Sequence, residues 1–234
     1  YGPRDPAISM PDGKTSPWDY FHDVQWLHAN PRKETAFIIA SNGKNDANIG
    51  WPQGVKFARA LQETRRPHRY NWGLQGHATR TLIDANFNMD LRIDQSLPAF
   101  TNCSLDQPIG TGTPVAATSN KSSAALPVKS GAGRAVPAQK DVPDPYDGAP
   151  MGAYNAFLSW DTASIVDESH QWEISAILEK TAPQDKCTVD ITPRRLQSFR
   201  TPVGSRFEYR VTHLQTKQLL HQGTATVDKA VSYT

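Results

Sequence analysis

The sequence of 234 residues predicts an α/β unit followed by an all-β unit. Residues 36–40 form an isoleucine-rich apolar run that ends in a Ser-Asn-Gly turn, which is typical of a buried strand in a parallel sheet. Residues 86–94 alternate instead between apolar and polar side chains, as a half-buried strand does. This switch predicts a boundary near residue 84, between an α/β unit at 1–83 and a β unit at 84–234.

An amphipathic helix is expected ahead of the buried strand. Its apolar side chains recur every three residues, at Trp18, Phe21, Val24 and Leu27. Ser16 is the expected N-cap, Pro17 suits the first helical position, and Asn30 and Pro31 end the pattern. We interpret the aromatic stripe as core packing against the sheet.

Residues 36–72 are expected to form a strand, a helix and a second strand. Asp46 lies in the loop after the first strand, where open α/β sheets place their reactive groups. The helix begins near Pro52 and carries apolar side chains on one side, at Val55, Ala58 and Leu61. A short aromatic strand at 68–72 then leads into a Gly-Leu-Gln-Gly loop and His77.

This order of strand, acid, helix, strand and Gly-His resembles the last third of the α/β-hydrolase fold, in which a loop Asp and a later loop His complete a serine triad. The resemblance covers about residues 15–82. It implies that Asp46 orients the general base His77. Trp51 and Trp72 flank these loops and are candidates to line an acyl or sugar subsite, although buried packing is the favoured interpretation of both.

The nucleophile of that family is not found in this sequence. Its elbow motif, Gly-x-Ser-x-Gly between a strand and a helix, does not occur. Ser9, Ser16 and Ser41 precede Asp46, as the order in the family requires, but none has flanking glycines or a strand-to-helix turn. We therefore expect the serine and most of the sheet to lie upstream of Tyr1 in a longer enzyme.

The β unit is expected to be interrupted by a long loop. Residues 107–150 are rich in Pro, Gly, Ser, Thr and Ala, a composition that buries too little apolar surface to order itself. Short β-rich segments separated by turns lie around it, at residues 98–106, 153–160, 170–178, 187–192, 206–212 and 223–227. Such spacing predicts a β-sandwich, which resembles an immunoglobulin-like domain in size and architecture only.

Several side chains of the β unit have alternative interpretations. Three acids resemble an oxygen-rich calcium loop, but without the EF-hand order a solvated loop is preferred: Asp141, Asp144 and Asp147. Arg194 and Arg195 are expected to be a surface pair or to make an ion pair with the first unit. Cys103 and Cys187 permit one disulfide, and both the bonded and the free form stay open.

Composition and charge disfavour several classes of function. The chain has 25 basic and 23 acidic residues and a net charge of +2, so it lacks the electrostatic footprint of a nucleic-acid-binding protein. No apolar run reaches the length of a membrane-spanning helix, and the histidines show no metal-ligand spacing. We therefore expect no nucleic acid, membrane, metal or cofactor as a partner.

The resemblance implies a serine hydrolase that acts on ester bonds rather than peptide bonds. Its expected partners are the upstream part of the same enzyme and an ester substrate, polymeric esters included, in a secreted or periplasmic location. The alternative is a non-catalytic β-sandwich that binds polysaccharide or protein and is attached to a hydrolase remnant. Upstream sequence would separate the two, because a Gly-x-Ser-x-Gly motif there favours the enzyme.

Overall fold

The structure is a computed structural model and describes residues 7–20, 22–77, 90–118 and 142–228. Strand accounts for 36% of this part of the chain and helix for 13%, so the fold is largely β. The helices are α1 (Pro17–Tyr20), α2 (Asp23–Ala29) and α3 (Trp51–Glu63). The strands are β1 (Ile38–Gly43), β2 (His68–Gly73), β3 (Leu97–Thr101), β4 (Pro114–Thr118), β5 (Asp144–Tyr146), β6 (Gly152–Tyr154), β7 (Leu158–Glu168), β8 (Gln171–Leu178), β9 (Asp190–Arg194), β10 (Arg206–Thr212) and β11 (Leu219–Thr226).

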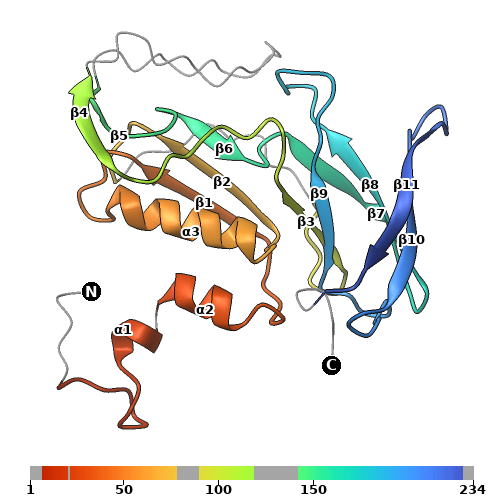
Figure 1. The fold of residues 1–234 in the computed structure, drawn as a ribbon, viewed down its shortest axis with the longest axis horizontal. Helices are drawn as coiled ribbons and strands as arrows, with labels where there is room; N and C mark the ends of the chain where they lie inside the picture. The colour runs from red at the N-terminus through yellow and green to blue at the C-terminus, as the bar shows by residue number, and fades with distance from the viewer. Residues whose placement is uncertain (1–6, 21, 78–89, 119–141, 229–234) are drawn as a thin grey trace.

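The expected strand, helix and strand of the first unit are confirmed in kind and order, but β1 continues to Gly43 and is not fully buried, since Ile39 is 43% exposed. β1 and β2 pair in parallel, in a register that runs from Ile38 opposite His68 to Gly43 opposite Gly73. α3 connects the two strands and lies along one face of the sheet (Figure 1). β6 adds an antiparallel third strand to β2, which gives the order β1-β2-β6.

α3 forms because its sequence provides both a start signal and one apolar face. Pro52 lies in its first turn, where the missing N–H costs no hydrogen bond. Val55, Ala58 and Leu61 are all buried against the sheet, and burial of each large aliphatic side chain stabilises the fold by about 1.5–3 kcal/mol. Arg65 then adopts φ 50°, a left-handed conformation that ends the helix.

The single helix expected over residues 17–28 is instead divided into α1 and α2. His22 breaks the pattern because it adopts an extended conformation and caps α2, with its Nδ1 accepting from the N–H of Gln25 at 3.2 Å. The apolar stripe is only partly used: Leu27 is buried, whereas Trp26 is 38% exposed. Phe21 lies outside the described residues.

The later strands form antiparallel pairs rather than one continuous sheet. The ladders are β3 with β9, β4 with β5, β7 with β8, and β10 with β11. Residues 90–94, the described part of the expected alternating strand, have no strand structure, and Ile93 is 84% exposed. Alternation alone was insufficient there because no described strand pairs with the segment.

Two apolar cores hold these elements together. The first core lies between α3 and the β1-β2-β6 sheet and consists of Leu27, Trp51, Val55, Ala58, Ala60, Leu61, Tyr70, Trp72 and Ile109. The second core lies among β3, β6, β7 and the loops around them and includes Leu97, Phe100, Cys103, Ala153, Phe157 and Trp160. Ile109 and β6 come from beyond residue 84, so both the first core and its sheet use residues from each side of the predicted boundary.

The ends of the predicted long loop are also ordered against the first core. β4 and β5 pair with each other, and Tyr146 and Ala149 pack on that core. Residues 119–141 lie outside the described part of the chain. Across the molecule, Arg194 is buried and its Nε donates to Glu34 at 3.0 Å, which confirms the ion-pair interpretation for this arginine.

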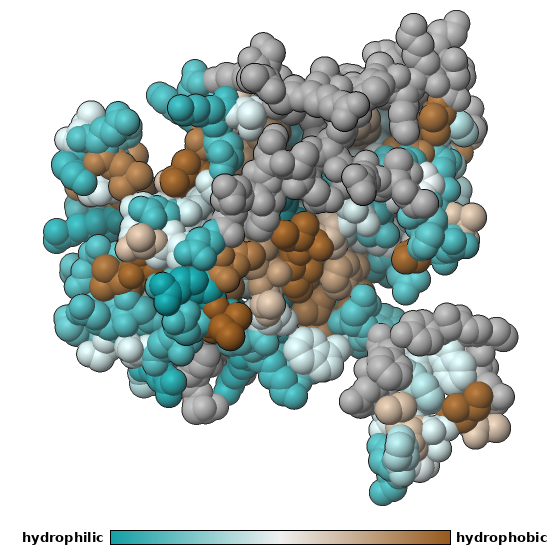
Figure 2. Space-filling model, turned by 180° about the vertical axis from the view of Figure 1, so that it is seen from behind, coloured by the Kyte–Doolittle hydropathy of each residue, from teal (hydrophilic) through white to brown (hydrophobic). Residues whose placement is uncertain are grey.

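The surface differs between the two sides of the molecule. Seen from behind, hydrophobic side chains gather near the middle, whereas the side that carries β10 and β11 is mostly hydrophilic with scattered apolar residues (Figure 2). Among the described residues, no helix combines the length and the hydropathy needed to cross a membrane.

Candidate active site

The loops after β1 and β2 lie side by side because the parallel strands end at the same edge of the sheet. The N–H of Lys44 donates to the carbonyl of Gly73 at 2.7 Å, and the N–H of Asn45 donates to that of Gln75 at 3.2 Å. Gly43 makes this approach possible, since a Cβ there would lie 2.0 Å from the Gln75 carbonyl oxygen. The backbone thus carries residues 46 and 77 to one place.

Asp46 and His77 meet at this edge. The Oδ2 atom of Asp46 lies 3.0 Å from the Nδ1 atom of His77. The Asp46 side chain is 5% exposed and the His77 side chain 53% exposed. A buried carboxylate therefore contacts one nitrogen of an imidazole that is exposed to solvent. Both residues were predicted from the sequence.

The Asp46 carboxyl is fixed by its own loop. Its Oδ1 atom accepts the N–H of Asn48 at 2.8 Å and that of Ile49 at 3.0 Å. Burial acts to raise its pKa, but the hydrogen bonds from Ile49, His77 and Asn48 outweigh burial and hold the pKa below its usual range. The group is therefore a carboxylate at neutral pH, with one oxygen anchored and the other turned to the histidine.

This geometry suits general acid–base chemistry. A carboxylate at Nδ1 favours the tautomer in which Nδ1 carries the proton and Nε2 is the free base. The Nε2 atom lies across the ring from the carboxylate, so it can take a proton from a hydroxyl group while Asp46 stabilises the resulting imidazolium. The pair alone supplies a base and its orienting acid, but no nucleophile.

Trp51 and Trp72 are packed in the first core, as the buried-packing interpretation expects. Their side chains are 0% and 2% exposed, and their rings pack together at 6.2 Å between centroids. The Nε1 atom of Trp72 donates to the carbonyl of Ala149 at 3.0 Å. Apolar packing in the first core positions both side chains.

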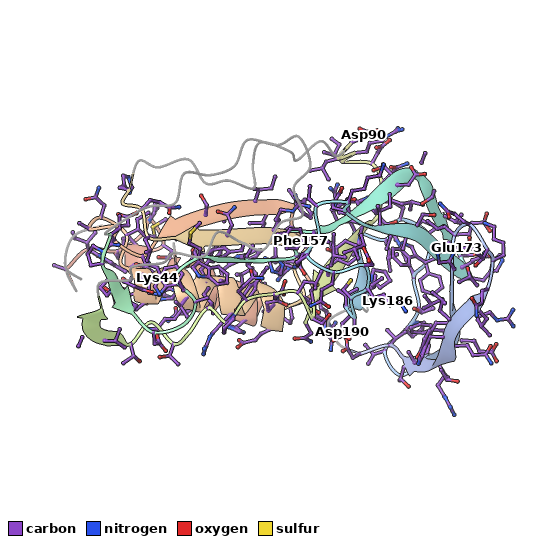
Figure 3. The ribbon with its side chains drawn as sticks, turned by 90° about the horizontal axis from the view of Figure 1, so that it is seen from above. Lys44, Asp90, Phe157, Glu173, Lys186 and Asp190 are labelled. Atoms are coloured by element: carbon purple, nitrogen blue, oxygen red, sulfur yellow. The ribbon has the colours of Figure 1, made fainter. Side chains whose placement is uncertain are left out.

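Lys44 was not singled out from the sequence, although it lies two positions before Asp46. Its ammonium is fully buried, pairs with the Asp144 Oδ1 atom at 2.7 Å, and lies 5.8 Å from the centre of the Trp51 ring. It also donates to three carbonyl oxygens, those of Tyr146, Asp147 and Ala149. Figure 3 shows Lys44 beside β5, at the opposite end of the molecule from Glu173 on β8.

Two of the three acids in the acidic segment make structural contacts within the protein. Asp144 neutralises Lys44, and Asp147 accepts the backbone N–H groups of Thr111, Gly112 and Thr113 at 2.8–3.0 Å. Asp141 lies outside the described residues. Within the described ranges, no group of three His, Cys, Asp or Glu side chains could hold a metal ion.

The two cysteines lie together in the second core as free thiols. A hydrogen bond joins their side chains. Burial raises the pKa of Cys103 to about 12 and also raises that of Cys187. Both are protonated at neutral pH, which makes them poor nucleophiles.

Comparisons of the chain with protein-family models, with curated protein sequences and with solved structures found no match. Among the described residues, Asp46 and His77 form a pair whose chemistry suits proton transfer.

Proposed function

We propose that Asp46 and His77 are the acid and the general base of a serine hydrolase that acts on ester bonds, with the nucleophilic serine supplied from outside these 234 residues. The observation that carries this proposal is the 3.0 Å contact between a buried, doubly anchored carboxylate and a half-exposed imidazole. The two backbone donors that bind one oxygen of Asp46 keep its other oxygen directed at the imidazole, as the orienting acid of a triad requires.

The corresponding fold proposal is that residues 1–83 belong to an α/β-hydrolase sheet. It is supported by the parallel β1 and β2 strands, the α3 crossover, and the positions of the acid after β1 and the histidine after β2. For residues 84–234 the immunoglobulin-like sandwich stays a prediction, and the antiparallel β7–β8 and β10–β11 ladders are the observations compatible with it.

The chemistry follows from the pair. The Nε2 atom of His77 takes the hydroxyl proton of the serine as its Oγ attacks the ester carbonyl, and Asp46 stabilises the imidazolium. Collapse of the tetrahedral intermediate expels the alcohol, which receives that proton, and leaves an acyl-enzyme. Water then repeats the sequence: His77 takes its proton, the acyl bond to serine breaks, and the serine regains a proton.

A binding module is the second candidate. The observation that favours it is the exposure of large apolar side chains on the β10–β11 hairpin, where Val211, Leu219 and Leu220 are 47%, 47% and 57% exposed. Such a surface suits a polysaccharide or a protein and requires no reactive pair. In that case Asp46 and His77 would be dispensable for function.

The test uses the enzyme together with its nucleophile-bearing part and a short activated ester. His77→Ala is expected to lower kcat by roughly 10⁶-fold and Asp46→Asn by roughly 10⁴-fold, as removal of a base and of its orienting acid does. His170→Ala is the matched control, because this histidine lies in the turn between β7 and β8 and its side chain is 76% exposed. Activity that survives His77→Ala in a folded protein would overturn the proposal.

A fluorophosphonate probe gives an independent answer about the nucleophile. Such a probe forms a covalent adduct with an activated serine, and digestion followed by mass spectrometry locates the adduct. We expect the labelled serine to lie outside residues 1–234, and we expect labelling to disappear in His77→Ala. A labelled serine inside this chain would refute the external nucleophile.

A further inference from the structure

Asn45 lies directly before Asp46 and contacts the loop that leads to His77. Its side-chain Nδ2 donates to the carbonyl of Leu74 at 2.7 Å and to the carbonyl of Pro143 at 2.9 Å. Its backbone N–H donates to Gln75. Three chain segments that are distant in sequence therefore converge on one half-buried amide.

We propose that Asn45 is a positioning residue that sets the distance between Asp46 and His77. This inference rests on the proposed function for its consequence in catalysis, but its geometric content stands separately. The side chain fastens the loop after β1 to the loop after β2, and it fastens both to the segment that begins β5. We call these contacts of Asn45 the joint. Asp46 directly follows Asn45 in the first loop, and His77 follows Leu74 closely in the second.

The third contact makes the joint rigid. Pro143 precedes Asp144, which is held by the buried ammonium of Lys44 at 2.7 Å. The ion pair of the next residue therefore restrains the carbonyl of Pro143. By binding this carbonyl, Asn45 holds the loop that leads to His77 at a defined distance from β5. The His77 ring is half exposed and its Nδ1 atom lies 3.0 Å from Asp46, so its placement depends on the backbone of the two loops.

An asparagine is the side chain this joint requires. Its Nδ2 carries two hydrogens, and each has a carbonyl acceptor. Aspartate has the same shape but offers only acceptors, so two carbonyl oxygens would face a carboxylate. Asn45→Asp is therefore a nearly isosteric change that converts both attractions into repulsions.

The geometric test uses the 234-residue chain labelled with ¹⁵N. In the wild-type protein, the Nδ1 proton of His77 is expected to give a resonance protected from exchange by its bond to Asp46. Asn45→Asp is expected to abolish that resonance, whereas Gln53→Glu should leave it unchanged. Gln53 is the matched control because it is an exposed amide in the first turn of α3, and its change adds the same charge.

Asn45→Ala provides a second variant without added charge, and it removes both donors while it keeps the backbone contact to Gln75. It is expected to broaden the same resonance. The proposal is overturned if both variants fold and retain the protected Nδ1 proton. It is also overturned if both variants lose the fold by circular dichroism, because Asn45 would then hold the structure rather than the pair.

The kinetic test is made in the complete enzyme. Asn45→Ala should lower kcat by about 10²-fold, the effect of displacing a reacting group by about 1 Å, while KM changes little. A rise in KM with unchanged kcat would overturn the positioning role. If the Nδ1 resonance is lost in the variant but His77→Ala has no kinetic effect, the positioning inference stands and the hydrolase proposal fails.

Discussion

The β2 strand and the β10–β11 hairpin show how differently two segments with strand-like sequences can be used. All six residues of β2 are buried, between α3, β1 and β6. In β11, by contrast, six of the eight residues are exposed and the other two are half-buried. The hairpin is held by its own ladder, whereas β2 is paired along both edges and also packs Tyr70 and Trp72 into the first core. Pattern predicts a strand, but the neighbours decide how much stability the strand provides.

The largest difference is expected between two lysines, one under the site and one on the hairpin. Lys44→Met should destabilise the fold by about 3–5 kcal/mol, because it leaves the buried Asp144 carboxylate without a partner. Lys217→Met, at an exposed position, should change stability by about 0.5 kcal/mol or less. Urea unfolding measured by tryptophan fluorescence gives both values.

A second substitution separates charge from packing at this site. Asp144→Leu added to Lys44→Met removes the unpaired carboxylate and should recover a large part of the lost stability. Equal stability of the Lys44→Met and Lys217→Met single variants would break the comparison between the two regions.

Two leucines extend the comparison to apolar packing. Leu61 of α3 is fully buried, and Leu61→Ala should cost about 2–5 kcal/mol. Leu220 of β11 is 57% exposed, and Leu220→Ala should cost about 0.5 kcal/mol or less. A calorimetric scan of each variant measures the difference. A large cost at Leu220 would mean that the hairpin packs against something else in solution.

The smallest effect concerns Asp106, which lies between α3 and the segment after β6. Its carboxyl accepts the N–H of Asn155 at 2.8 Å and the Gln62 amide of α3 at 3.3 Å. Burial raises its pKa to about 7, against opposing hydrogen bonds. The folded state therefore binds the proton more tightly than the unfolded chain does, so the stability contributed by Asp106 is largest below about pH 4 and falls as pH rises to about 7.

Asp106→Asn should remove this dependence. Relative to wild type, the variant should gain about 1–2 kcal/mol between pH 4 and pH 8, a figure reduced for partial solvent screening. Urea midpoints at several pH values test it, with Glu208→Gln on the exposed face of β10 as the control. Parallel pH profiles of wild type and Asp106→Asn would show that Asp106 is not the titrating group.

The sequence was sufficient for the parts of the site that depend on local order. Asp46 and His77 follow consecutive parallel strands, and parallel strands end together, so their meeting could be predicted without coordinates. The break between α1 and α2 could not be, because it depends on the extended conformation of one residue, His22.

The site residues that were not predicted from the sequence owe their roles to partners far along the chain. Lys44 and Asn45 look like ordinary polar loop residues until Asp144 and Pro143 are brought to them. The sequence left two interpretations of Trp51 for a related reason, because nearness to a reactive loop in sequence does not show which way a side chain faces. Segments rich in Pro, Gly and Ser can still order when fixed polar groups hold their ends, as Asp147 does for Thr111.

The pairing of β6 with β2 has a consequence for a chain that is cut. β2 precedes the long stretch of residues 78–141, and β6 follows it, yet they are neighbours in one sheet. Arg194 and Glu34 join the same two halves through an ion pair in which Arg194 is fully buried. A protease that cut this connecting stretch would leave two fragments that complement each other. One fragment would carry the Asp46 and His77 pair, and the other would carry Pro143, which binds the neighbouring Asn45.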